Sequence, residues 1–276
     1  MNKIVQATQL LFENLIDTNP NQFYIPPHAL LRQSIAHYTI SLPARNHGSE
    51  YLTLIPDASG CIVCTYDGKY LDCNFWGPTT QTTIVKNDAD ENIFRFFIEF
   101  LPCGAYHLTG IDISELTDLQ VPLSIINLPL AKSIDELFEQ SKSIQELVDL
   151  LDKTFLSCLS KIQPTNYIAP ILSYIQAKNG TMTVKELSTA TFYSERHLNR
   201  MITPILGMNV KSYSKLLRIN TALKNINNDV SFTNLAQTLN YYDQSHFIHD
   251  FKSVCGVTPT AYLQNMSDFY KEDFKF

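Results

Sequence analysis

The spacing of apolar residues divides this chain into a first part with a strand pattern and a second part with a helical pattern. Between about 23 and 125, short apolar runs alternate with turn residues such as Asp67-Gly68 and Gly77-Pro78. Runs of β-branched and aromatic residues that end at turn signals are typical of strands. We expect strands at 52–55, 61–66, 82–85 and 94–100. So many short strands at close spacing predict a sandwich or a barrel.

Two capping boxes mark the start of a helical segment after the strand pattern. Ser133-x-x-Glu136 and Ser143-x-x-Glu146 each place a glutamate three residues after a serine, and such pairs satisfy the free amides at a helix start. The second box precedes a broad apolar stripe within 144–162. A stripe of this width usually packs on its own domain, and a homodimer seam is the alternative. The proline-containing break at 163–166 ends this helical linker.

The last third of the chain contains an internal repeat. Four positions of the first copy recur 49 residues later: Leu198 as Phe247, Ile202 as Phe251, Gly207 as Gly256 and Tyr213 as Tyr262. Each copy has the pattern of a short helix, a tight turn and a second helix, which is typical of a helix-turn-helix motif. The stretch 209–226 between the copies has apolar residues at helical spacing, so we expect a long helix there.

The second helix of each copy has a polar outer face. In the first copy, Leu198, Ile202 and Ile205 form an apolar stripe that leaves the polar side chains outside. Arginine can bond guanine through two atoms, and asparagine or glutamine can bond adenine, so such a face suits the major groove of DNA. The candidate DNA-binding residues are Arg196, Asn199, Arg200, Gln244, Ser245, His246, His249 and Lys252. A helical protein-interaction module with a merely solvated outer face is the alternative.

Charge is distributed unevenly along the chain. The formal net charge of the whole chain is −6, which taken alone argues against a nucleic-acid partner. Residues 178–262 carry nine Lys and Arg against five Asp and Glu, a net charge of +4 that leaves −10 for the rest. A basic module in an acidic chain indicates a nucleic-acid surface joined to another function.

Several motifs in this helical part match a known family. They are Leu187-Ser188, Tyr193-Ser194-x-x-His197-Leu198-x-Arg200, Gly207-x5-Tyr213, Arg218-Ile219-x-x-Ala222, Leu235-Ala236, Ser245-x-Phe247-x-x-x-Phe251-Lys252 and Gly256-x-Thr258-Pro259-x-x-Tyr262. On these motifs, residues 167–262 resemble the AraC-type transcription regulators. The resemblance implies two helix-turn-helix subdomains that each place one helix in the major groove of double-stranded DNA. The base-facing residues that it implies are Arg196, Asn199 and Arg200, then Gln244, Ser245, His246 and His249.

We call the second helix of each copy, which the resemblance places in the major groove, its reading helix. The chain departs from the usual pattern of that family near the second reading helix. Asn240-Tyr241 stands where Gly-Phe is usual, and asparagine tolerates the left-handed backbone that the turn requires. His249 and Leu263 stand where the family usually has arginine. We therefore expect the second subdomain to bind DNA more weakly or to read a looser sequence.

A further set of motifs lies in the strand-rich part. They are Leu54-Ile55-Pro56-Asp57, Gly77-Pro78, Phe100-Leu101-Pro102-Cys103-Gly104-Ala105, Glu115-Leu116-Thr117-Asp118 and Val121-Pro122-Leu123. They resemble the N-terminal domain of one AraC-type subgroup. That resemblance implies a cupin-like small barrel with a helical linker, which senses a small-molecule effector or dimerises.

These observations predict an α+β chain of two domains that forms a homodimer. Residues 1–132 are expected to form a mainly-β, cupin-like sensor or dimerisation domain. Residues 133–163 form the helical linker. Residues 164–276 form an all-α DNA-binding domain, with helix-turn-helix motifs at about 183–204 and 231–254.

The cysteines offer a sharper alternative. Cys61-x-x-Cys64 together with Cys73 has the residue types of a soft-metal site or a thiol-redox sensor. On a strand, however, residues three apart point to opposite faces, so Cys61 and Cys64 would not converge without a turn. Free cysteine is also common in protein cores, and we therefore favour ordinary core cysteines without a metal.

The sequence does not favour an enzyme. His28, His37, His47 and His107 are scattered and form no His-x-His pair of the kind that metal-dependent cupin enzymes use. No nucleophile elbow, phosphate loop or His-Glu-x-x-His motif occurs, so we predict no catalytic residue and no cofactor. A cupin-type enzyme fused to a helical interaction module is the third alternative. The chain shows no transmembrane stretch and no signal-peptide pattern, so we expect no membrane partner and a cytoplasmic location.

Overall fold

The computed structural model describes residues 22–41, 51–86, 94–159, 168–227 and 230–264. The strands in these ranges are β1 (Gln22–Ile25), β2 (Ile35–Ser41), β3 (Tyr51–Leu54), β4 (Cys61–Tyr66), β5 (Leu71–Trp76), β6 (Thr83–Lys86), β7 (Phe94–Phe100) and β8 (Gln120–Pro122). Short 3-10 helices occur at η1 (Ala29–Leu31) and η2 (Ile113–Glu115). The first domain is therefore mainly β, as the sequence predicts.

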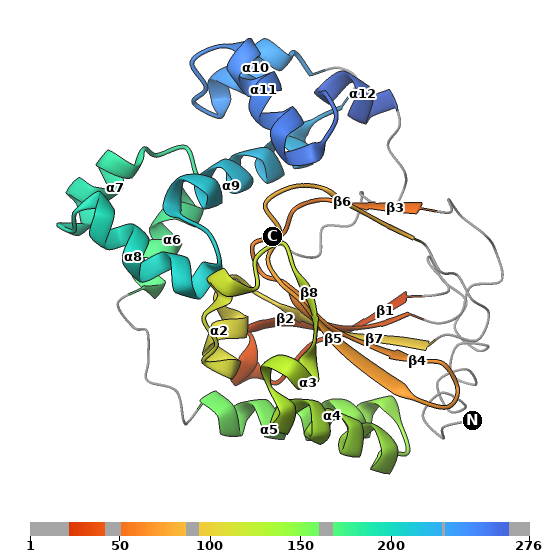
Figure 1. The fold of residues 1–276 in the computed structure, drawn as a ribbon. Coiled ribbons are helices and arrows are strands. Elements are labelled where there is room, and N and C mark those ends of the chain that lie inside the picture. Colours follow the sequence, from red (N-terminus) through yellow and green to blue (C-terminus); the bar gives the residue numbers. More distant parts are fainter. Residues whose placement is uncertain (1–21, 42–50, 87–93, 160–167, 228–229, 265–276) are drawn as a thin grey trace.

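Six of these strands form one antiparallel sheet in the order β1-β2-β7-β4-β5-β8. Strands β3 and β6 pair with each other in a separate ribbon. Among the described residues, β1 and β8 are the free edges of the sheet, so it is open (Figure 1). The closed small barrel that the family resemblance implied is therefore not formed by the described strands.

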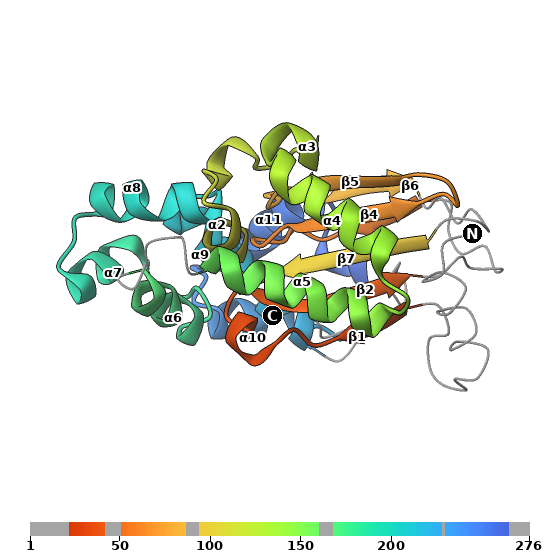
Figure 2. The same ribbon diagram turned by 90° about the horizontal axis from the view of Figure 1, so that it is seen from below.

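Helices cover the inner face of the sheet in place of a second layer of strands. They are α2 (Gly104–Thr109), α3 (Leu123–Ile126), α4 (Leu128–Gln140) and α5 (Ile144–Leu159). Side chains of all four pack into one core with alternate residues of the strands, such as Phe94, Phe96 and Ile98 of β7. Figure 2 shows α4 and α5 lying across the sheet. Because these helices bury the apolar face, the sheet needs no closure to do so.

The apolar stripe of the helical linker belongs to this core. Leu151 and Phe155 of α5 have no exposed surface, and Leu147 and Val148 have almost none. Asp152 on the same helix accepts a hydrogen bond from the buried Tyr38 hydroxyl at 2.8 Å. In its described part, residues 144–159, the stripe thus packs mainly on its own domain.

The second domain is all helical. Its helices are α6 (Ala169–Ala177), α7 (Val184–Thr191), α8 (Glu195–Leu206), α9 (Val210–Asn225), α10 (Phe232–Thr238), α11 (Gln244–Cys255) and α12 (Pro259–Gln264). Helices α7 and α8 form the first helix-turn-helix motif, and α10 and α11 form the second. The 16-residue helix α9 joins them, which confirms the fold predicted for this domain.

Local sequence signals place the ends of these helices. Thr183 and Glu186 form the predicted capping box at the start of α7, with bonds in both directions. Ser194 and Asp243 cap the two reading helices by accepting bonds from the amides three residues later. Asn240 has a φ of +58°, so the left-handed turn that its residue type allows is formed.

Candidate nucleic-acid interface

Helix α8 separates its apolar and polar residues sharply. Leu198, Ile202 and Ile205 are buried in the core of the helical domain, and Met201 is half-buried against the same core. Arg196 and Arg200 are exposed. The hydrophobic pattern therefore positions both arginines on the outer surface, as the sequence predicts.

A small polar and aromatic cluster orients Arg200. Its guanidinium nitrogen Nη2 lies 3.0 Å from Nδ1 of His197, one helical turn earlier. The ring of His197 in turn stacks on Tyr193, with ring centroids 4.9 Å apart. Partial ordering of an exposed arginine reduces the side-chain entropy that it loses when it binds a partner.

Asn199 has a different place from the one expected of a base-reading residue. It is half-buried, and its Oδ1 accepts a hydrogen bond from the Val210 amide at 3.0 Å. Val210 is the first residue of α9, where an amide has no partner within its own helix. A two-atom contact to adenine would need this same Oδ1. Asn199 therefore joins α8 to α9 in this structure.

Helix α11 presents its polar residues on its own outer face. Ser245, His246, His249 and Lys252 are exposed, whereas Phe247 and Phe251 are fully buried. Gln244 is half-buried, and its Oε1 accepts a hydrogen bond of 2.7 Å from Thr233 of α10. The first residue of α11 thus fixes the two helices of the second motif against each other.

The structure adds a buried acid that the sequence analysis did not single out. Asp250 of α11 lies 3.6 Å from Nη2 of Arg218 on α9. The same carboxylate has His246 at 3.9 Å and His249 at 3.7 Å. The Arg218 guanidinium also lies over the Tyr241 ring, 4.4 Å from its centroid. Asp250 therefore connects His246 and His249 to Arg218 on the long helix α9. In the sequence, the sign of this contact was an acidic residue next to the apolar Phe251.

Two aromatic side chains in the turns before the reading helices were also missed. Phe192 precedes the cap of α8 and is 95% exposed, and Tyr242 precedes the cap of α11 and is 94% exposed. Phe192 has a φ of +59°, which non-glycine residues rarely adopt. Both rings are therefore open to contact with a partner that approaches the starts of the reading helices.

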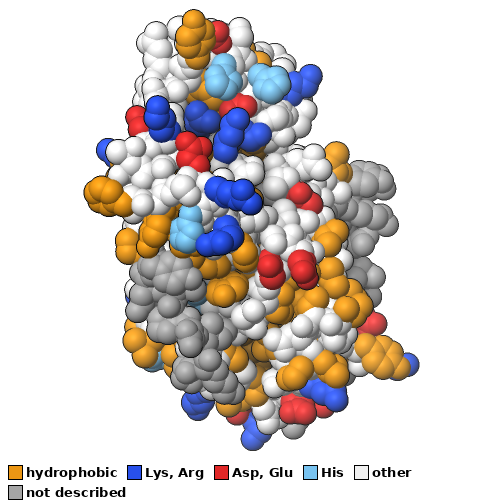
Figure 3. All heavy atoms as spheres, turned by 60° about the vertical axis from the view of Figure 1, so that its left-hand side comes forward, with side chains coloured by type: hydrophobic (Ala, Val, Ile, Leu, Met, Phe, Trp, Pro, Cys, Tyr) orange, Lys and Arg blue, Asp and Glu red, His pale blue; other side chains and the backbone are white. Residues whose placement is uncertain are grey.

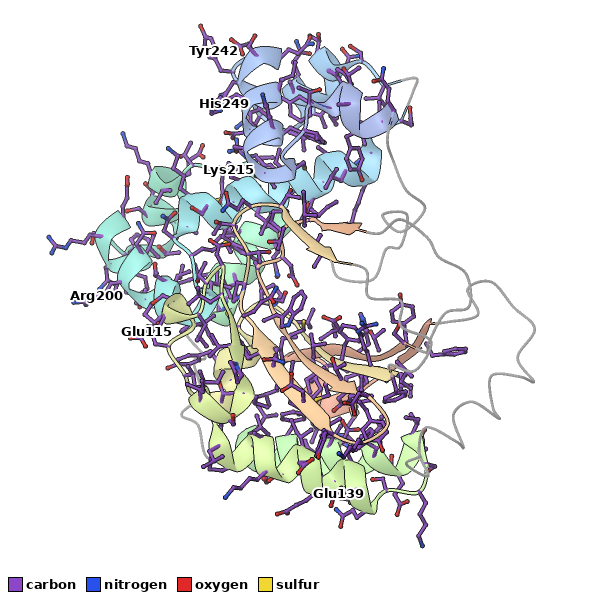
Figure 4. All side chains as sticks on the ribbon, turned by 45° about the vertical axis from the view of Figure 1, so that its right-hand side comes forward. Glu115, Glu139, Arg200, Lys215, Tyr242 and His249 are labelled. Carbon is purple, nitrogen blue, oxygen red and sulfur yellow. The ribbon has the colours of Figure 1, made fainter. Side chains whose placement is uncertain are left out.

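Arg200 of the first motif and His249 of the second lie on one side of the helical domain. Arg200, Lys215 and His249 are labelled in Figure 4 along the same side. Lys215 of α9 donates a hydrogen bond to Ser253 Oγ of α11 at 3.2 Å, so it lies between the two reading helices. Figure 3 shows the Lys, Arg and His side chains gathered over this domain. The arrangement gives one positively charged surface with a reading helix at each end.

The opposite ends of both reading helices contact the first domain. Thr117 Oγ1 donates to the carbonyl of Gly207, which ends α8, at 2.6 Å. Thr82 donates to the carbonyl of Val254 in the last turn of α11 through its amide at 3.0 Å and its hydroxyl at 2.7 Å. The last carbonyls of a helix have no partner within it. Two threonines of the first domain therefore supply the missing donors of both helices.

Asp118 connects the loop that carries Thr117 with the loop that carries Thr82. Its carboxylate accepts bonds from the Thr80 amide and hydroxyl, both at 2.7 Å, and its amide donates to the Pro78 carbonyl at 2.8 Å. Asp118 itself has a φ of +59°. We call residues 77–82 and 113–118 the interdomain loops. Through them, the C-terminal ends of α8 and α11 are held by one connected part of the first domain.

The cores of the domains also meet. Ala58 and Cys103 of the first domain pack in the same buried cluster as the helical domain. Burial raises the pKa of the Cys103 thiol to about 12, so this thiol stays protonated at neutral pH. Pro204 lies inside α8, and a proline there cannot donate to the carbonyl of Arg200.

The described residues contain no group of three or more His, Cys, Asp or Glu that could hold a metal ion. Cys61, Cys64 and Cys73 thus do not form the metal site considered from their spacing. Within the same ranges, no helix is both long enough and apolar enough to cross a membrane.

Comparison with known proteins bears on each domain separately. A family model described as a helix-turn-helix domain matches residues 187–265. A second model, described as a domain of unknown function (DUF6597), matches residues 24–122. No curated protein matches the chain.

Several solved structures show a weaker likeness. The C-terminal domain of AraT, a response regulator from Geobacillus stearothermophilus, is 21% identical, over 39% of this chain and 93% of that chain, with a TM-score of 0.35. ToxT from Vibrio cholerae is 11% identical, over 90% of this chain and 97% of that chain, with a TM-score of 0.38. Wild-type ToxT bound to an unsaturated fatty acid is 13% identical, over 88% and 93% of the two chains, with a TM-score of 0.37.

The fold and the match to the helix-turn-helix model define the class of this protein. It has a β-rich first domain and a C-terminal domain with two helix-turn-helix motifs. That C-terminal domain is a helix-turn-helix domain of the AraC type. The assignment supports a DNA-binding transcription regulator, and it does not favour enzymatic activity.

Proposed function

We propose that this chain regulates transcription by reading one DNA site with α8 and α11 in successive turns of the major groove. The observation that carries the proposal is the shared outer surface, on which each reading helix exposes polar or basic side chains. Helix α9 is 16 residues long, so it spans about 24 Å. With the side chains at both ends, this length is compatible with two major-groove turns about 34 Å apart.

The side chains divide into three roles. Arg196 and Arg200 of α8 are exposed and can reach base edges, as can Ser245, His246 and His249 of α11. Lys252 is exposed on the last turns of α11 and supplies attraction to phosphate. Gln244 can contribute only if its bond to Thr233 is exchanged. Asn199 acts by positioning α9, and its Oδ1 can contact a base only if its bond to the Val210 amide is exchanged.

The exposed turn aromatics extend this surface. Phe192 and Tyr242 stand just before the N-terminal ends of α8 and α11, which are the ends that approach the groove in helix-turn-helix proteins. Contact with deoxyribose or a thymine methyl group would bury them.

The first domain acts on DNA binding through the interdomain loops. An effector that bound it would shift the protein only if it favoured one arrangement of the domains over another. Because Thr82 and Thr117 contact the ends of both reading helices, a change in either loop alters the position of one helix relative to the other. We further propose that the chain works as a homodimer. Its domains would be residues 1–132, a linker at 133–163, and residues 164–276.

A selection experiment tests this function. Full-length protein is used to enrich sequences from a random pool of double-stranded DNA, and the affinity for the enriched site is then measured by fluorescence anisotropy. Arg200→Ala should weaken that affinity by about 1–3 kcal/mol, or roughly 5- to 150-fold, because it removes a two-atom base contact. Arg32→Ala is the matched control, since Arg32 is an exposed arginine of the first domain.

Three outcomes would contradict the proposal. One is the absence of any enriched sequence. Another is equal affinity of Arg200→Ala and wild type for the enriched site. The third is binding that does not weaken as salt rises, because phosphate contacts release bound cations.

A further inference from the structure

The cysteines Cys64 and Cys73 lie directly opposite each other in the sheet. Strands β4 and β5 are antiparallel neighbours, and their register pairs Cys64 with Cys73. Residues in direct opposition on antiparallel strands point to the same face. Both side chains accordingly belong to the helix-covered face, where Cys64 is buried and Cys73 is half-buried against the same core.

The hydrogen-bond pattern makes this pair the kind that can be cross-linked. The turn between the strands is closed by a bond from the Asp67 amide to the Tyr70 carbonyl. Hydrogen-bonded and non-hydrogen-bonded pairs alternate along an antiparallel ladder. Counting back from this bond, Cys64 and Cys73 form a non-hydrogen-bonded pair. Such pairs have Cα atoms about 4.5 Å apart, which falls in the range of about 4.4–6.8 Å found for disulfides.

The two sulfur atoms are already in contact. The Cys73 thiol donates to Cys64 Sγ, with the sulfur atoms 2.7 Å apart. Closing a bond therefore needs only a small rotation of the side chains and no movement of the strands. Cys61 is not part of this pair, because its neighbour on β5 is Trp76. It also stands three residues before Cys64 on the strand, so the two side chains point to opposite faces of the sheet.

We propose that Cys64 and Cys73 form a redox-active pair that closes a cross-strand disulfide when the protein meets a peroxide. This property concerns the first domain and does not depend on the proposed DNA binding. The chain then carries, besides its proposed DNA-facing surface, a site of reversible oxidation on the helix-covered face of the sheet.

The reaction proceeds in two steps. Cys73 is the half-buried member, so its sulfur attacks one oxygen of the peroxide. The O–O bond breaks, Cys73 becomes a sulfenic acid, and the second oxygen leaves as water with the thiol proton. The sulfur of Cys64 then displaces the hydroxyl group, the S–S bond forms, and the hydroxyl leaves as water with the Cys64 proton. Two thiols are oxidised to one disulfide, and hydrogen peroxide is reduced to two waters.

The order of these steps follows from the surroundings of the two thiols. The hydrogen bond with Cys73 and burial raise the pKa of the Cys64 thiol, so it stays protonated. Burial also keeps this thiol out of contact with solvent. Cys64 therefore acts second, when the sulfenic acid is already beside it.

Peptide mapping of the oxidised full-length protein tests the proposal. Reduced protein is treated with hydrogen peroxide, its remaining thiols are blocked under denaturing conditions, and trypsin digestion follows without reductant. Lys69 lies between the two cysteines, so trypsin separates them unless a disulfide joins the fragments. We expect a linked pair of peptides that dithiothreitol separates.

Variants identify the sulfur atoms involved. The link should persist in Cys61→Ala, which shares a tryptic fragment with Cys64, and should disappear in both Cys64→Ala and Cys73→Ala. Cys158→Ala is the control for a half-buried cysteine of α5 and should form the link as wild type does. If Cys64→Ala does not fold by circular dichroism, persistence of the link in Cys61→Ala together with its loss in Cys73→Ala decides.

Two results would overturn the proposal. In one, peroxide converts Cys73 to sulfinic acid while Cys64 remains free to react with the blocking reagent. In the other, the linked peptides still form in Cys64→Ala, which would make Cys61 the partner.

Discussion

Gly207 and Gly256 form a matched pair that can measure the contact between the two domains. Each ends a reading helix with a left-handed backbone, at φ values of +77° and +74°. A methyl group added at Gly207 would lie 2.6 Å from Thr117 Oγ1 and 3.2 Å from Ile113 Cγ2. At Gly256 the nearest atom would be Thr82 Cβ, 3.8 Å away. The two alanine substitutions therefore share the backbone strain and differ in the contact with the first domain.

The expected costs follow from these two terms. A left-handed backbone costs a residue with a side chain about 1–2 kcal/mol, which is the whole cost expected for Gly256→Ala. Gly207→Ala adds overpacking worth about 1–3 kcal/mol, for a total of about 2–5 kcal/mol. Urea unfolding of the full-length protein measures both. Trp76, the one tryptophan of the chain, adjoins the interdomain loops and serves as the fluorescence probe.

A double substitution isolates the steric contact. Thr117→Ala removes the Oγ1 atom that the new methyl group would meet, so the two changes should not be additive. We expect Gly207→Ala with Thr117→Ala to lose less free energy of unfolding than the sum of the single losses, by more than about 0.5 kcal/mol. Additive losses, or equal losses in Gly207→Ala and Gly256→Ala, would refute the inferred contact between Thr117 and α8.

Three further predictions concern other contacts. Asn199→Ala should lower the free energy of unfolding by about 1–3 kcal/mol, because the Val210 amide loses its acceptor, and denaturant titration measures this. Backbone and side-chain hydrogen bonds from Thr183 lower the pKa of Glu186, so the stability from this carboxylate is present above its ordinary pKa and is lost as the pH falls through the lowered value. Unfolding midpoints between pH 7 and pH 3 should therefore fall less steeply in Glu186→Gln than in wild type. Leu151→Asp should unfold the first domain, because it places an unpaired charge in the core, and folded monomers in light scattering and circular dichroism would contradict this.

The helical domain was largely predictable because its signals are local. The caps Ser194 and Asp243, the capping box at Thr183 and the left-handed turn at Asn240 each depend on residues within a few positions of one another. The buried stripe of α8 follows from a repeat of about four residues. Each of these patterns lies within one short segment of the sequence. The structure forms these caps, this capping box and this turn as predicted.

The features that the sequence did not reveal depend on contacts between distant segments. Thr82 and Val254 are 172 residues apart, and Thr117 and Gly207 are 90 apart. No spacing rule relates such positions. The sequence likewise places Asn199 on the outer face of its helix. It does not reveal that the Asn199 side chain bonds the Val210 amide. Whether the sheet closes also depends on which distant strands pair, and no local pattern gives that pairing.

Pro204 gives α8 a mechanical property beyond its part in the fold. The turns before it carry the exposed Arg196 and Arg200, and the turn after it ends at Gly207 against Thr117. The hydrogen bond that would normally join these two halves is absent, because proline has no N–H for the Arg200 carbonyl. The missing hydrogen bond lies between the half that carries the exposed arginines and the half that touches the first domain. A proline inside a helix weakens it at that point, so α8 resists bending less between these two halves than a helix with all of its backbone hydrogen bonds.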